Sequence, residues 1–166
     1  MTEHKTRAEA ISKLGEMIKD IRIAMFTTAE SDGTLHSRPM AIQDRDFDGD
    51  LWFFTGASSG KVSDIQQDQH VNVGFAAPED NRYVSVSGTA SLVRDQAKIK
   101  ELWNPILKAW FPDGLKDPDL ALLRVDVHQA EYWDSPSSTM VQIVGFIKAI
   151  ATGKQADGGE NEKIQL

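Results

Sequence analysis

The chain has 166 residues, of which 40% are hydrophobic and 26% charged, and its formal net charge is −7. This length suits one compact domain, and the composition is sufficient for a folded core. The absence of cysteine excludes disulfides, thiolate metal ligands and cysteine nucleophiles. The acidic balance disfavours nucleic acid as a partner, because nucleic-acid binding usually requires a basic surface. A small anion needs only a few well-placed cations and stays open as a ligand.

The hydropathy of the sequence indicates no membrane partner. No apolar run approaches the roughly 20 residues that a membrane-spanning helix needs. Residues 1–10 are polar and charged, unlike the apolar stretch of a secretory signal. We therefore expect a soluble cytoplasmic protein.

The first third of the sequence predicts one helix and several strands. Apolar residues recur at three- and four-residue steps over residues 5–20, which indicates an amphipathic helix. Residues 21–28 are rich in β-forming residues and apolar on both faces, as is typical of a central strand. Two closely spaced turn signals then favour an antiparallel meander of further strands. These turns and strands are 31–33, 35–46, 48–49 and 51–55.

The middle of the sequence alternates between strands and helical stretches. A loop over residues 56–61 leads into a short helix that ends near residue 69, and alternating apolar residues then indicate two strands. The next helical pattern is interrupted by Pro105. The two strands and the interrupted helical stretch are 71–75, 83–93 and 96–110.

The last third predicts the final strands and a terminal helix. Residues 120–127 and 130–133 read as a sixth strand and a seventh, or as one kinked strand. Apolar positions from Met140 to Ile150 indicate a last helix, and Gly153 suits its C-cap. The Gly-, Glu- and Lys-rich residues 154–166 are expected to form a loosely ordered tail.

These elements together predict a mainly β fold, namely a small β-barrel with flanking helices. Closing six short strands into a barrel removes exposed strand edges, which favours a barrel over an open sheet. Two or three helices would cover the open ends. We expect a single domain over residues 1–153, including both terminal helices, followed by the tail.

The strand–loop–helix segment over residues 51–65 carries the clearest chemical signal. A Gly/Ser loop leads into a helix that begins at a lysine, and the N-terminus of a helix favours an anion. Hydroxyls of Thr55, Ser58 and Ser59, together with the charge of Lys61, suit a phosphate dianion. The loop is not a Walker loop, because the GxxxxGK[ST] spacing is absent. A serine that simply caps a surface helix is an equally good interpretation of this pattern.

A second polar cluster covers residues 36–40, one hairpin before that loop. Pro39 cannot donate to a sheet ladder, which implies an edge strand or a bulge whose free backbone groups can meet a ligand. Arg38 would place a fixed positive charge there. The alternative is an exposed Arg38 in an ordinary surface ion pair.

Aromatic and titratable residues elsewhere give weaker signals. Trp103, Trp110 and Trp133 could stack on an aromatic ligand, although tryptophans more often fill cores or interfaces. The four histidines show no metal-ligand spacing, so we predict no metal site. No arrangement of serine, histidine and aspartate can be assigned as catalytic from the sequence.

Several segments, in their order and spacing, resemble the pyridoxamine 5′-phosphate oxidase-like FMN-binding split barrels, and within them the general stress protein 26 subgroup. The resemblance covers nearly the whole chain. It implies a six-stranded antiparallel split barrel that binds FMN in a cleft between the two subunits of a homodimer. The matching segments are 13–25, 35–40, 51–55, 58–61, 131–134, 144–146 and 159–163.

The resemblance also implies roles for single residues. Lys61 and Ser59 match positions that bind the phosphate, with Ser58 and Thr55 beside them. Arg38 matches an arginine near the flavin and the phosphate, and Gln43 stands where the oxidases keep a lysine. The remaining cofactor contacts implied are Pro39 and Met40 along the isoalloxazine ring, and Trp133 near the flavin, contributed by the partner subunit.

One departure from the family pattern bears on function. The oxidases grip the substrate phosphate with a C-terminal segment that contains arginine and histidine, whereas here no arginine follows Arg124 and no histidine follows His128. We therefore do not expect oxidation of pyridoxamine phosphate. The expected function is that of an FMN-dependent oxidoreductase in the general stress response, with a nicotinamide as a candidate reductant. The alternatives are a non-catalytic flavin-binding module that acts as a store, sensor or partner-binding protein, and a split barrel with another cofactor such as a deazaflavin or haem.

Overall fold

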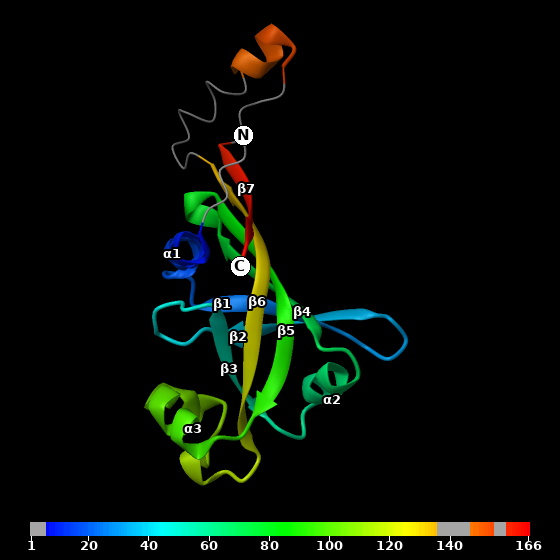
Figure 1. Ribbon diagram of the computed structural model, residues 1–166, viewed down its shortest axis with the longest axis vertical. Coiled ribbons are helices and arrows are strands. Elements are labelled where there is room, and N and C mark those ends of the chain that lie inside the picture. The colour runs from blue at the N-terminus through cyan, green and yellow to red at the C-terminus, as the bar shows by residue number, and fades with distance from the viewer. Residues whose placement is uncertain (1–5, 136–146, 155–158) are drawn as a thin grey trace.

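The computed structural model describes residues 6–135, 147–154 and 159–166, and its centre is a curled antiparallel sheet (Figure 1). Neighbouring strands follow the order β2-β1-β4-β5-β6-β3, and β7 pairs with β6. The mainly β architecture with flanking helices confirms the predicted fold class. The strands are β1 (Ile23–Ala29), β2 (Leu35–Ala41), β3 (Asp50–Gly56), β4 (His70–Ala77), β5 (Arg82–Val93), β6 (Leu120–Asp134) and β7 (Glu160–Gln165).

Short helices flank the curled sheet (Figure 1). The N-terminal helix starts with a capping box, in which the Thr6 hydroxyl accepts from the Glu9 N–H and the Glu9 carboxylate accepts from the Thr6 N–H. Its buried face includes Leu14 and Ile18. None of the described helices is long and apolar enough to cross a membrane. The helices are α1 (Arg7–Ile18), α2 (Gly60–Gln67) and α3 (Gln96–Leu102), with short 3-10 helices η1 (Pro78–Asp80), η2 (Pro105–Ala109) and η3 (Gly114–Lys116).

The expected meander is correct for β1 and β2 but wrong for β3. Strands β1 and β2 form the predicted hairpin, with Phe26 opposite Arg38. Strand β2 ends at Ala41 rather than near residue 46, and β3 pairs with β6 instead of β2. The reason is burial: β3 is largely buried and needs an apolar neighbour, which the buried first half of β6 supplies and the mostly exposed β2 does not.

Strand β6 is one continuous strand rather than two. Its pairing with β5 shifts register at Ser87 and Gly88, where His128 becomes the extra residue of a β-bulge. The backbones approach so closely there that a Cβ on Gly88 would lie 2.1 Å from the Asp126 carbonyl oxygen. The bulge explains why the sequence suggested a kink at this position.

The C-terminal residues do not form the loose tail that the composition suggested. Strand β7 pairs with the second half of β6, beyond the part that β3 covers, and buries Ile164. It therefore protects an edge that would otherwise stay open. Residues 147–152 are helical and Gly153 has φ of 65°, as expected of a C-cap. The preceding part of the predicted last helix lies outside the described residues.

Two apolar clusters hold the fold together. The larger lies inside the curled sheet, where the rings of Phe26 and Phe53 meet edge to face at 5.2 Å between centroids. The smaller fixes the connection between β5 and β6 against the sheet. Its buried members are Phe54, Ile99, Leu107, Leu120 and Leu122.

Candidate functional site

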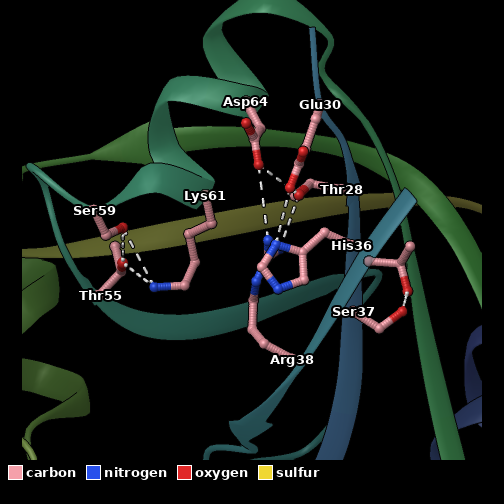
Figure 2. A network of polar contacts seen from close by, with 10 residues as sticks. Thr28, Glu30, His36, Ser37, Arg38, Thr55, Ser59, Lys61 and Asp64 are labelled. Carbon is pink, nitrogen blue, oxygen red and sulfur yellow. Dashed lines mark hydrogen bonds and ion pairs between the residues drawn. The ribbon is translucent and has the colours of Figure 1, made fainter. Parts of the chain in front are cut away.

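The end of β3 and the start of α2 bring a lysine and two hydroxyls together (Figure 2). The Lys61 Nζ donates to Thr55 Oγ1 at 3.1 Å and to Ser59 Oγ at 3.3 Å. The two hydroxyl oxygens are 3.2 Å apart. Ser59 occupies the N-cap position of α2, but its side chain makes no capping hydrogen bond. The interpretation of the loop as a plain serine cap is therefore wrong for Ser59.

Within the described part of the chain, no acidic side chain neutralises the charge of Lys61. The side chain is half-buried, and among the residues that the structure describes no carboxylate forms an ion pair with it. Burial, and to a smaller extent the charge of Arg38, lower the pKa of Lys61 below its ordinary value. A half-buried, uncompensated cation at a helix N-terminus favours an anionic ligand.

Arg38 is held near this lysine by interactions with Thr28 and Asp64 (Figure 2). Its Nη1 donates to Thr28 Oγ1 at 2.8 Å, and that hydroxyl donates to Asp64 Oδ2 at 2.9 Å. Arg38 Nη2 also lies 3.7 Å from the same carboxylate oxygen, and only 15% of the Arg38 side chain is exposed. An exposed arginine in an ordinary surface pair is therefore the wrong description. Arg38, Lys61 and Asp64 together leave one positive charge in excess.

A cavity of about 430 Å³ opens next to Lys61. Residues of β2 form one part of its wall, residues 54–56 at the end of β3 a second part, and residues 107–111 a third. Four of the sequence-predicted residues line it, namely Pro39, Met40, Thr55 and Lys61, and so does Gln43. The other lining residues are Ile23, Ala41, Phe54, Gly56, Leu107, Trp110 and Phe111.

Two of the predicted residues do not join this group within one chain. The Ser58 hydroxyl donates to Asp119 Oδ2 at 2.7 Å, and its N–H donates to Asp119 Oδ1 at 3.0 Å, so Ser58 is engaged on another carboxylate. Trp133 lies near the far end of β6, whose first residue, Leu120, is opposite Gly56. The intervening strand spans up to roughly 43 Å. Within this chain, Trp133 is not among the residues that line the Lys61 cavity.

Sequence reasoning missed the wall formed by Leu107, Trp110 and Phe111. The sequence marks Trp110 only as one of three tryptophans that could stack on an aromatic ligand, and nothing in the local sequence connects residues 107–111 with β2. The connection comes from the packing of Leu107 and Phe111 on Phe54.

In the described parts of the chain no three metal-ligating side chains are grouped so that they could hold a metal ion.

Comparison with known proteins gives consistent matches. A family profile described as "Pyridoxamine 5'-phosphate oxidase like" matches residues 9–157. Protein bli-3 of Neurospora crassa is 34% identical over 158 residues, which cover 89% of this chain and 76% of the relative.

Two solved structures of general stress proteins share the fold. The general stress FMN/FAD binding protein of Xanthomonas citri is 33% identical, with a TM-score of 0.67, over 79% of this chain and 92% of that one. The general stress protein 26 of Bacillus anthracis is 28% identical, with a TM-score of 0.65, over 74% of this chain and 92% of that one. The chain thus belongs to the pyridoxamine 5′-phosphate oxidase-like family.

Proposed function

We propose that the chain binds FMN, with the phosphate at Lys61 and the flavin ring in the adjoining cavity, and that it acts as a flavin-dependent oxidoreductase. The observation that carries the proposal is the uncompensated Lys61, held by two hydroxyls at one end of a largely apolar cavity. The relative from Xanthomonas citri, described as FMN/FAD binding, supports a flavin as the ligand.

The residues present fit a ligand with an anionic end and a flat apolar body. Lys61 and the hydroxyls of Thr55 and Ser59 would hold the phosphate, assisted by the N-terminus of α2. A terminal phosphate carries more charge than either phosphate of the internal pyrophosphate in FAD, which favours FMN at a site with one excess cation. Pro39 and Met40 would lie along the ring.

When bound, the flavin supplies hydride and electron transfer, and the protein supplies placement, electrostatics and access. Arg38 keeps a fixed positive charge next to the phosphate end, because Thr28 and Asp64 fix its guanidinium. The apolar side chains that line the cavity would shield part of the ring from water. We assign no side chain as a catalytic acid, base or nucleophile, and we propose a nicotinamide as the electron donor.

The proposal is tested by FMN titration of the wild-type chain and three lysine variants. We expect Lys61→Met to weaken FMN binding by about 10- to 100-fold, the equivalent of one charge-assisted hydrogen bond. Lys61→Arg should retain much of the affinity because it keeps the charge. Lys100→Met is the matched control, since Lys100 is an exposed residue of α3 outside the cavity. Undiminished FMN binding by Lys61→Met would contradict the proposed phosphate site.

The second candidate function is a flavin-binding module without turnover. The observation that favours it is the absence of an arginine or histidine in the C-terminal segment after His128. Steady-state oxidation of NADH and NADPH by the FMN-loaded chain separates the two candidates. Saturable turnover supports the oxidoreductase, and FMN binding without turnover supports the module.

A further inference from the structure

One aromatic side chain that lines the cavity is largely exposed to solvent. Trp110 is 63% exposed, although it lines the same cavity as Pro39, Met40 and Lys61. Tryptophan offers the largest apolar surface of any side chain, so covering this one with a ligand would be favourable.

The segment that carries Trp110 is firmly held. The N–H groups of Trp110 and Phe111 both donate to the Leu107 carbonyl, at 3.0 and 2.9 Å. Leu107 is buried in the smaller apolar cluster, and the ring of Phe111 lies 6.4 Å from that of Phe54. The backbone position of Trp110 is therefore fixed by packing and does not depend on a ligand.

We infer that Trp110 is a ligand-binding residue that closes the cavity over a flat aromatic ring. This rests on the proposed function, under which the ring is that of the flavin. The cavity lining combines residues of β2, residues 54–56 at the end of β3 and residues 107–111 with Lys61. Lys61 is the sole charged side chain among the described residues that line the cavity. Away from Lys61 the cavity lining is uncharged and therefore suits an uncharged planar group.

A neighbouring residue provides a matched control. Ile106 belongs to η2, whose C-cap is Trp110, and is 73% exposed, but it does not line the cavity. If the exposed apolar surface of this segment served a contact with another protein, Ile106 and Trp110 would contribute alike. If Trp110 binds a ring in the cavity, the two residues must behave differently.

The experiment is a titration of wild type, Trp110→Ala, Trp110→Phe and Ile106→Ala with FMN and with riboflavin, followed by flavin fluorescence. Riboflavin carries the ring without the phosphate. We expect Trp110→Ala to weaken both ligands by a similar factor, on the order of tenfold. Trp110→Phe should recover most of the loss, and Ile106→Ala should match wild type. The inhibition constant of inorganic phosphate against FMN should be the same in wild type and Trp110→Ala, because the substitution leaves Lys61 and its hydroxyl partners unchanged.

Three results would overturn the inference. FMN binding by Trp110→Ala at wild-type strength would remove Trp110 from the site while leaving the proposed function intact. Equal losses in Trp110→Ala and Ile106→Ala, accompanied by a change of oligomeric state, would assign the segment to a subunit contact. A higher inhibition constant of inorganic phosphate in Trp110→Ala would show that the substitution acts through general damage to the site and not through a contact with the ring. A wild-type chain that binds neither flavin would instead defeat the proposed function itself.

Discussion

Lys61 combines a positive charge with partial burial, and this combination makes its protonation sensitive to an anion. Burial and Arg38 lower its pKa in the folded chain, so the unfolded chain holds this proton more tightly. The free energy of unfolding of the ligand-free chain therefore rises with pH between the folded and the ordinary pKa of the lysine. A bound phosphate favours the charged form and raises that pKa again.

FMN affinity is accordingly expected to fall as pH rises through the lowered pKa of Lys61, because binding then requires uptake of a proton. FMN titrations at a series of alkaline pH values measure this effect. Lys61→Arg is the control, since a guanidinium stays charged over the whole range. An identical fall in affinity for wild type and Lys61→Arg would show that another group is responsible.

The buried hydroxyl of Thr28 links Arg38 to Asp64, and its removal should be costly. Thr28→Val keeps the shape of the side chain but leaves both charged groups short of a partner. We expect a loss of about 1–3 kcal/mol in the free energy of unfolding, measured by urea denaturation. Thr27→Val is the matched control, because Thr27 is the preceding residue of β1 and its hydroxyl is hydrogen-bonded to that of Ser37 at an exposed position. Equal losses in the free energy of unfolding of the two variants would contradict a special role for the Thr28 hydroxyl.

Local sequence signals located the cluster of Lys61 and its hydroxyl partners but not the other parts of the candidate site. Thr55, Ser59 and Lys61 follow one another across a single loop, so a strand–loop–helix pattern is sufficient to group them. The engagement of Ser58 by Asp119 depends on residues 61 positions apart, and the position of Trp110 depends on packing against Phe54. Such contacts leave no trace in the local pattern.

At the level of secondary-structure elements, β7 shows how a weak pattern can hide a buried strand. Ile164 is 3% exposed in a segment that is otherwise polar. We expect Ile164→Ala to lower the free energy of unfolding by about 2–4 kcal/mol. Gln165→Ala is the control, since Gln165 is exposed on the same strand. An Ile164→Ala variant as stable as wild type would mean that these residues form a loose tail in solution.

The existence of most elements could be predicted from periodicity and turn residues, whereas their pairing could not. The capping box, the hairpin of β1 and β2, and the interruption at Pro105 all follow from nearby residues. The pairing of β3 with β6 joins residues about 70 positions apart, and it was decided by the burial of both strands. Residues 120–134 form one strand rather than two because a bulge opposite Ser87 and Gly88 takes up the irregularity.

At the scale of the whole molecule, apolar side chains on the outer face of β1 support the proposed homodimer. Ile23 and Met25 are 50% and 45% exposed, and Ile23 also lines the cavity next to Lys61. A second subunit that covered β1 would therefore also cover the cavity, as expected of FMN at a subunit interface.

We expect the wild-type chain to be dimeric in light scattering at micromolar concentration, and Met25→Lys to shift it towards the monomer because a charge would be buried in the interface. Leu115→Lys is the control, since Leu115 is similarly exposed but belongs to η3. A wild-type chain that elutes at the mass of a monomer would contradict the homodimer.

The measurement that tests the central claim most directly is the calorimetric titration of the purified, flavin-free chain with FMN. The account predicts saturable binding of about one FMN per chain and a yellow complex that survives gel filtration. A colourless protein that releases or absorbs no heat on addition of FMN would contradict it.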